Sequence, residues 1–413
     1  MRTGAIGRVT IATLIAAASG YLVLLIAARD LGAAGYGVFA VFWAAYGMVT
    51  GAQNGQLQET TRAVRAAVDA EAPRDATHPW RVNMAIGLVL GALVAATSPL
   101  WSPHVFTEYR WLSVALLSVG VASFAVYAHL AGALSGSVSW GAFAILLSVD
   151  ALIRLAGAVL ALLIGGGLVA FLVITVVGSV SWMLLLVASP EARRAVGLPG
   201  DVPTGRFTAN TVTAMAAAAA SAVLVMGFPV LINATSGHRA ADTATVGAVV
   251  LAVTLTRAPL LVPLNSFQGV LITRFVDGRA RPIAALAAPL AAVCAIGVVG
   301  AVAAWAIGPW LLSTVFGADF RLSGLSVGWF TLGATTLALL TVTGAAAIAV
   351  GAHRWYAAGW WIATLASIGL LLLPLGVADR VAIALIGGPI VGMAVHGAGL
   401  VLRSRPTAAT ARV

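Results

Sequence analysis

The sequence contains no lysine, a single cysteine and very little charge. Only 9% of its 413 residues are charged, whereas a typical soluble protein carries about 25%. A chain without lysine has neither a Walker A phosphate-binding motif nor a Schiff-base lysine, which excludes an ATPase subunit and a pyridoxal enzyme for this chain alone. Cys294 cannot form an internal disulfide, and no two of the six histidines have metal-ligand spacing. We therefore expect no cofactor and no metal.

Long apolar stretches take the place of the missing charge. Hydrophobic residues make up 61% of the chain, and its mean hydropathy is +1.02. A membrane-spanning helix needs roughly 20 apolar residues, so the pattern predicts an all-α polytopic membrane protein with about 12 transmembrane helices. The expected spans are Ile6–Ala28, Val38–Leu57, Val82–Leu100, Trp111–Leu134, Gly141–Ile164, Leu168–Ala188, Thr208–Ile232, Val246–Ile272, Ile283–Ile307, Leu325–Val350, Trp355–Leu375 and Val381–Leu402.

The basic residues, all arginine, predict the orientation of the chain. If the N-terminus is cytoplasmic, sixteen arginines lie in cytoplasmic segments and five lie outside. This bias follows the positive-inside rule and places both termini in the cytoplasm. The arginines are scattered singly, so we expect no nucleic-acid partner despite the formal net charge of +10. Two arginines, Arg154 and Arg257, remain inside predicted spans.

A segment rich in proline and glycine separates two halves of the chain. Residues 189–207 contain Pro190, Pro199, Gly200 and Pro203, a composition typical of a linker. We expect a six-helix bundle in residues 1–188, a cytoplasmic linker in 189–207, a second six-helix bundle in 208–402 and a cytoplasmic tail in 403–413. Because each half has an even number of spans, the two would be parallel repeats.

Charged residues within spans are costly and usually face a cavity or a partner. Asp150 and Arg154 are four residues apart, so they share one face of the fifth span. One interpretation is an internal ion pair that neutralises both residues. The other is that Arg154 lines a cavity, where Asp150 moderates its charge or couples it to protons.

Arg257 in the eighth span has no acidic residue within a helical turn. Thr254, Arg257, Leu261, Asn265 and Gln268 follow helical spacing and form a mostly polar stripe. This pattern favours a cavity wall, although an acid on another span could pair with Arg257.

The second predicted span combines glycine with polar residues. Gly47, Gly51 and Gly55 recur at intervals of four, which predicts a small-residue packing seam. Gly47 and Gly51 also share a face with Asn54 and Gln58, so the same helix could be a moving gate or a pore wall.

The first loop carries a family resemblance. Residues 27–40 read Ala-Ala-Arg-Asp-Leu-Gly-Ala-Ala-Gly-Tyr-Gly-Val-Phe-Ala. The segment resembles the first loop of Wzx-type polysaccharide-biosynthesis flippases, members of the multidrug/oligosaccharidyl-lipid/polysaccharide exporter superfamily. The resemblance implies two six-helix bundles around a central cavity and alternating access. It also implies a substrate in which a saccharide is linked to undecaprenyl diphosphate, moved across the bacterial plasma membrane for cell-surface polysaccharide synthesis.

We therefore expect a flippase and not an enzyme. Its partners would be the lipid-linked saccharide, membrane lipids, and the polymerase and glycosyltransferases of the same pathway. Arg154 and Arg257 would hold the diphosphate, because a guanidinium binds phosphate bidentately. An ion-coupled small-molecule exporter is the alternative, with Asp150 as the coupling residue. A membrane glycosyltransferase is disfavoured because the outside connections are short. The remaining candidate binding residues are Asn54, Gln58, Asn265 and Gln268.

Overall fold

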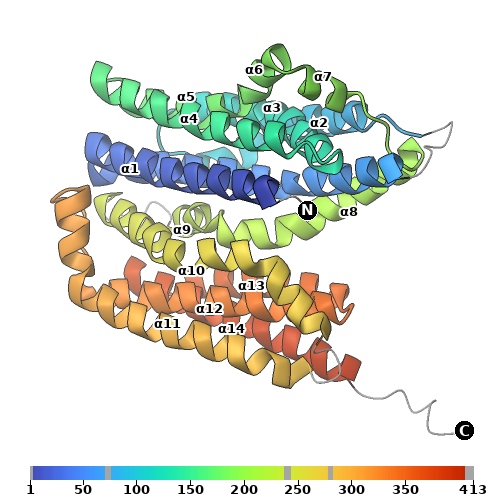
Figure 1. The fold of residues 1–413 in the computed structure, drawn as a ribbon. Coiled ribbons are helices and arrows are strands. Elements are labelled where there is room, and N and C mark those ends of the chain that lie inside the picture. Colours follow the sequence, from blue (N-terminus) through green and yellow to red (C-terminus); the bar gives the residue numbers. More distant parts are fainter. Residues whose placement is uncertain (1–2, 70–75, 237–242, 278–281, 405–413) are drawn as a thin grey trace, which may run out of the picture. The chain divides into compact units, whose positions relative to one another are not determined.

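The computed structural model describes residues 3–69, 76–236, 243–277 and 282–404, and these are helices joined by short connections (Figure 1). No strand occurs among them. Ten helices in this described part are long and apolar enough to cross a membrane. The predicted all-α, polytopic fold class is confirmed.

The first helix, α1 (Thr3–Asp69), is long enough to be two spans. Its apolar stretch covers 62 residues, or about 93 Å at a rise of 1.5 Å per residue, and the hydrocarbon core is only about 30 Å thick. The helix is interrupted at Gly32, whose φ of 65° and ψ of 179° are not helical. Glycine adopts this positive φ without the penalty that a side chain brings.

The two arms of α1 run in opposite directions. A Cβ added to Gly141 would lie 3.5 Å from Nη1 of Arg8, in the first arm. A Cβ added to Gly136 would lie 2.9 Å from Cβ of Val64, in the second arm. Gly136 and Gly141 flank a single short turn, so both ends of α1 lie at the same end of the unit. The two predicted spans Ile6–Ala28 and Val38–Leu57 are therefore confirmed as an antiparallel pair.

The chain divides by contacts into two compact units, the first being Met1–Val230. Its segment Gly167–Ala188 is a continuous apolar stretch that contains one 3-10 turn. The elements of this unit after α1 are α2 (Pro79–Val105), α3 (Arg110–Gly136), α4 (Trp140–Ile164), α5 (Gly167–Val177), η1 (Gly178–Val180), α6 (Ser181–Ala188), α7 (Pro190–Val196) and α8 (Thr204–Val225).

The second unit is Leu231–Val413, and the short helix α9 (Phe228–Ser236) crosses the boundary. One of its helices, α13, matches the predicted block Trp355–Leu375 but is not among the ten candidate spans. The elements of this unit are α10 (Thr243–Asp277), α11 (Pro282–Leu311), the π-helical turn η2 (Leu312–Phe316), α12 (Gly324–Ala349), α13 (His353–Leu371) and α14 (Val377–Ser404).

The glycine seam on the second arm of α1 packs against α8. A Cβ added to Gly55 would overlap the backbone of Ala214 and Met215, and one added to Gly51 would lie 2.8 Å from Cβ of Ala222. The predicted packing seam is thus confirmed. Because α8 packs here, the first compact unit continues through the linker at 189–207 and ends at Val230. The sequence places the end of the first bundle earlier, at residue 188.

The linker itself is ordered against the first unit. Its helix α7 buries Ala192 and Ala195 in a cluster with residues of α3 and α4. Beyond α7, the backbone N–H of Gly200 donates to the carbonyl of Thr77 at 2.9 Å, and the N–H of Thr77 donates to Val202 at 3.0 Å. These reciprocal bonds fix the linker to the residues just before α2.

Aromatic residues of the family-like loop form part of the core of the first unit. Tyr36, Phe39 and Phe42 are fully buried. The ring of Phe39 meets that of Phe171 edge-on at 5.7 Å, and Phe42 lies 5.9 Å from Phe106. Tyr36 and Phe39 of residues 27–40, and Phe42 just after them, therefore have a packing role at the base of the second arm.

Candidate functional site

Asp150 and Arg154 of α4 form the ion pair that their spacing predicts. Nη2 of Arg154 donates to Oδ1 of Asp150 at 2.9 Å. The two side chains are only 15% and 16% exposed. An apolar span therefore carries a charged pair that is mostly shielded from its surroundings.

Two aromatic rings and a glycine enclose the guanidinium of Arg154. Its Cζ lies 5.8 Å from the ring centre of Trp43 and 5.7 Å from that of Tyr46, both on the second arm of α1. Rings at this distance attract a cation through their negative faces. Gly178 of η1 leaves room for the side chain, because a Cβ at that position would overlap Nε of Arg154.

Arg154 retains hydrogen-bonding capacity despite its burial. Its Nε is buried and has no hydrogen-bond partner in the structure. Buried polar groups are nearly always paired, and an unused guanidinium N–H is a strong donor to phosphate or carboxylate oxygens. Because Gly178 packs directly against Nε, an acceptor could reach this donor only if the surrounding helices moved.

Arg257 lies in the second unit, on α10, and is 7% exposed. The hydroxyl of Thr254, predicted to share its stripe, donates to the carbonyl of Val250 in the preceding turn. A cavity of about 230 Å³ between α10, α11 and α12 is lined by the neighbouring Thr256 and Pro259 and not by Arg257. The side chains of Asn265 and Gln268 lie outside the described residues. A cavity-lining role for this stripe stays a prediction.

Asn54 and Gln58, the candidates on the second arm of α1, are both exposed. Successive helical residues are about 100° apart around the axis, so Asn54 points well away from Gly55, which faces α8. The polar residues that do enter the interior are their neighbours Gln53 and Gln56, which are fully buried. A substrate-binding role for Asn54 and Gln58 stays a prediction.

The buried polar residues connect four helices of the first unit. The Asn83 side chain donates to Oγ1 of Thr60 at 2.8 Å and lies 3.3 Å from Nδ1 of His129. Nε2 of His129 lies 3.1 Å from the carbonyl of Val196. A carbonyl only accepts, so Nε2 carries the proton and Nδ1 accepts from Asn83. His129 therefore serves as a neutral link between α2, α3 and the end of α7.

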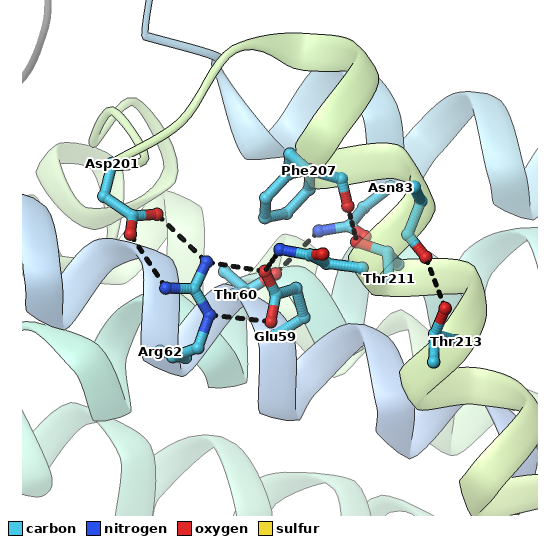
Figure 2. A network of polar contacts seen from close by, with 10 residues as sticks. Glu59, Thr60, Arg62, Asn83, Asp201, Phe207, Thr211 and Thr213 are labelled. Atoms are coloured by element: carbon cyan, nitrogen blue, oxygen red, sulfur yellow. Dashed lines mark hydrogen bonds and ion pairs between the residues drawn. The ribbon is translucent and has the colours of Figure 1, made fainter.

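A second polar network, drawn in Figure 2, joins α1 to the linker and α8. Arg62 makes two hydrogen bonds to Glu59, at 2.8 and 2.7 Å, and two to Asp201, at 2.8 and 3.0 Å. The side chain of Asn210 on α8 donates to Glu59 at 3.1 Å. The three-residue spacing of Glu59 and Arg62 could have revealed this pair from sequence, but nothing in the sequence pointed to Asp201.

Arg380 is one of the five arginines that the sequence predicts outside the cytoplasm, and in the structure it has a packing role. It is 8% exposed and donates to the carbonyls of Thr235 and Leu371 at 3.0 and 3.2 Å. It also donates to Oγ of Ser236 at 2.7 Å. A cation is favourable at the C-terminal end of a helix, and Arg380 meets the ends of both α9 and α13.

Several solved transporters share this fold. An inward-facing multidrug resistance MATE family transporter of the MOP superfamily aligns with a TM-score of 0.76 and 13% identity, covering 98% of this chain and 100% of that one. The lipid II flippase MurJ in an inward closed conformation gives 0.69 and 13% identity, covering 96% and 89%. A MOP superfamily transporter from Pyrococcus furiosus gives 0.62 and 16%, covering 97% and 96%. The chain is a multi-pass membrane protein with the MOP superfamily fold.

Sequence comparison identifies relatives of the chain. Uncharacterized protein Rv1510 of Mycobacterium tuberculosis is 50% identical over 403 residues, covering 97% of this chain and 92% of that protein. Uncharacterized protein Mb3654 of Mycobacterium bovis is 48% identical over 396 residues, covering 95% and 91%. No family model matches. The chain belongs to the same family as these mycobacterial proteins.

Proposed function

We propose that this protein is a flippase that moves a diphosphate-linked lipid saccharide across the bacterial plasma membrane by alternating access. The observation that carries the proposal is the enclosed guanidinium of Arg154, which has an unused buried donor. The fold supports it, because the lipid II flippase MurJ shares that fold. Cell-surface polysaccharide synthesis is the proposed pathway, and flipping makes and breaks no covalent bond.

The chemistry of Arg154 suits a phosphorylated substrate. Asp150 offsets one positive charge through a single hydrogen bond, which leaves other guanidinium N–H groups for a ligand. A diphosphate presents several anionic oxygens, and the planar guanidinium of arginine can bind two of them bidentately. In this proposal Arg257 supplies a second cationic contact, and hydrogen bonds to the sugars come from Asn54, Gln58, Asn265 and Gln268.

The partners in this proposal follow from the pathway. The lipid-linked saccharide arrives from glycosyltransferases on the cytoplasmic side and leaves to a polymerase outside. Both termini are then cytoplasmic, in accordance with the arginine bias. The Wzx-type loop at residues 27–40 fits the same assignment.

An ion-coupled small-molecule exporter is the second candidate. A specific observation favours it: Asp150 is a carboxylate inside a candidate membrane span, and an intramembrane acid is a common place for ion coupling. The two candidates differ in what Asp150 does. In the flippase it tunes the charge of Arg154, and in the exporter it binds and releases the coupling ion.

Depletion of the protein in its host tests the proposal directly. Undecaprenyl-linked intermediates are then extracted and probed for accessibility on each leaflet. We expect one such intermediate to accumulate on the cytoplasmic leaflet. Unchanged pools of every lipid-linked saccharide would refute flipping, and loss of drug efflux under an imposed ion gradient would favour the exporter.

Variants of the ion pair test the role of Arg154. Replacing Arg154 alone leaves Asp150 buried without its partner, which costs about 3–5 kcal/mol and confuses function with folding. The double variant Asp150→Asn/Arg154→Gln removes both charges together, so that neither is left buried without its partner. We expect it to insert at normal abundance and to lose at least about tenfold in flipping rate, the effect of roughly 1.4 kcal/mol.

Two further variants complete the design. Arg206→Gln, an exposed arginine at the start of α8, is the matched control and should flip normally. Asp150→Asn leaves the charge of Arg154 unpaired, so its transport rate is compared per molecule of inserted protein. It should retain flipping if the carboxylate only tunes charge, and should abolish transport if it carries the coupling ion. Full activity of the double variant would remove Arg154 from the substrate site.

A further inference from the structure

An apolar groove runs along the surface of the first unit. It has a volume of about 720 Å³ and lies between α2 and α8, with Ala52 of α1 at its base. Its walls are apolar side chains such as Val89 and Val212, which are 58% and 53% exposed. The polar lining residues are Arg81, Thr204 and Thr208, and all three lie at one end.

Two helix N-termini meet at this polar end. Helix α2 begins at Pro79 and α8 begins at Thr204, and neither N-cap residue makes a side-chain capping bond. Oγ1 of Thr204 donates to Oγ1 of Thr77 at 3.2 Å, which holds the two helix starts side by side. Pro79 has no N–H, and the N–H of Arg81 donates to the carbonyl of His78 at 3.0 Å. The free N–H groups at this end therefore come mainly from the first turn of α8, whose partial positive charge attracts an anion.

Arg81 adds a full positive charge at the same place. Its side chain is exposed, and its guanidinium lies 5.4 Å from the ring centre of Trp80. Glu59 and Asp201 pair with Arg62, and Arg81 forms no ion pair with the described residues. A tryptophan and an arginine at the end of an apolar groove are typical of the level of lipid headgroups.

The length of the groove indicates which membrane molecule fits. From Arg81 to Leu90 it follows α2 for about 14 Å, and from Thr204 to Ala219 it follows α8 for about 22 Å, at 1.5 Å per residue. Both lengths fall short of the hydrocarbon thickness of about 30 Å. The wall along α2 matches one leaflet of about 15 Å, and the wall along α8 ends short of the far interface, so the occupant enters from one interface.

We propose that this groove binds one anionic glycerophospholipid of the leaflet on the Arg81 side. One acyl chain lies between α2 and α8, and the phosphate sits at Arg81 and the two helix N-termini. The lipid joins α8 to α2, which otherwise leave a gap between them. The site is separate from Arg154, and the proposal does not depend on what the protein transports.

Native mass spectrometry of the full-length protein tests the site with defined lipids. Phosphatidylglycerol and phosphatidylcholine of equal chain length compete for the purified protein. We expect one phosphatidylglycerol to be retained with about tenfold preference, which corresponds to roughly 1.4 kcal/mol. Arg81→Gln should reduce the preference below about twofold. Arg206→Gln, a neighbouring arginine that does not line the groove, should leave it unchanged.

A second variant tests the apolar part of the site. Ala216→Phe places a ring in the groove without changing charge, and should lower retention of both lipids. An unchanged preference in Arg81→Gln would overturn the proposal. So would displacement of phosphatidylglycerol by equimolar undecaprenyl phosphate, because the groove would then hold the chain of a polyprenyl lipid. Flipping is tested separately, through Arg154.

Discussion

Adding one methyl group at each glycine of the α1 seam should destabilise the protein in a graded order. The nearest atom to an added Cβ is 3.7 Å away at Gly47 and 2.8 Å away at Gly51, and it is backbone at Gly55. At Gly47 the neighbour is the flexible side chain of Met226, whereas Cβ of Ala222 and the backbone of Ala214 and Met215 can move only with α8. We therefore expect the loss of stability to increase from Gly47→Ala through Gly51→Ala to Gly55→Ala.

The expected size follows from two opposing effects. Replacing glycine by alanine inside a helix stabilises it by about 1 kcal/mol. Overpacking costs about 1–3 kcal/mol, and a backbone overlap belongs at the upper end. Gly55→Ala should then lose about 2 kcal/mol, which lowers the melting temperature of a unit of this size by roughly 4–8 °C. Gly47→Ala, which meets only an ordinary contact, should be neutral or slightly stabilised.

Thermal unfolding in detergent, followed by tryptophan fluorescence, measures this order. Gly20→Ala is the matched control, because Gly20 lies on the first arm of the same helix with nothing within 4 Å of an added Cβ. It should raise the apparent melting temperature by up to about 4 °C. Equal melting temperatures for Gly20→Ala and Gly55→Ala would refute close packing of α1 against α8.

Two polar networks give further predictions that the same assay checks. Asp201→Asn removes a partly exposed ion pair, so it should cost less than about 1 kcal/mol; Glu59→Gln, which weakens contacts to both Arg62 and Asn210, should cost about 1–3 kcal/mol. The reverse order would contradict the burial of Glu59. Arg380→Gln removes charged hydrogen bonds at the ends of α9 and α13 and should cost about 3 kcal/mol, whereas Arg321→Gln in an exposed turn should have little effect.

The sequence predicted features that depend on local spacing. Apolar length located the spans, four-residue glycine spacing located the seam, and the i,i+4 relation located the Asp150–Arg154 pair. Each of these follows from the 3.6-residue period of a single helix. The partner of the seam was not predictable in this way, because α8 comes more than 150 residues later and packing between distant helices leaves no local pattern.

The sequence did not predict which polar residues of the second arm enter the interior. Asn54 and Gln58 lie on roughly the same face of the helix as Gly47 and Gly51. The tightest contact with α8, however, is at Gly55. A rotation of less than one residue spacing decides which side chains enter the interior. Periodicity fixes relative positions on a helix and not the direction in which the helix faces, which packing sets.

The reversal of α1 at Gly32 fixes the relative depth of residues on its two arms. Because the chain turns within a single residue and both arms rise 1.5 Å per residue, residues equally far from Gly32 lie at nearly equal depth. Tyr21 and Trp43, each eleven positions away, are one such pair. Elsewhere a connection can absorb a change in length. In this hairpin, an inserted or deleted residue in one arm would rotate every following side chain by about 100° about the helix axis. It would also shift that side chain by 1.5 Å relative to its neighbour on the other arm. We therefore expect relatives of this protein to differ by substitution in this hairpin and by insertion elsewhere.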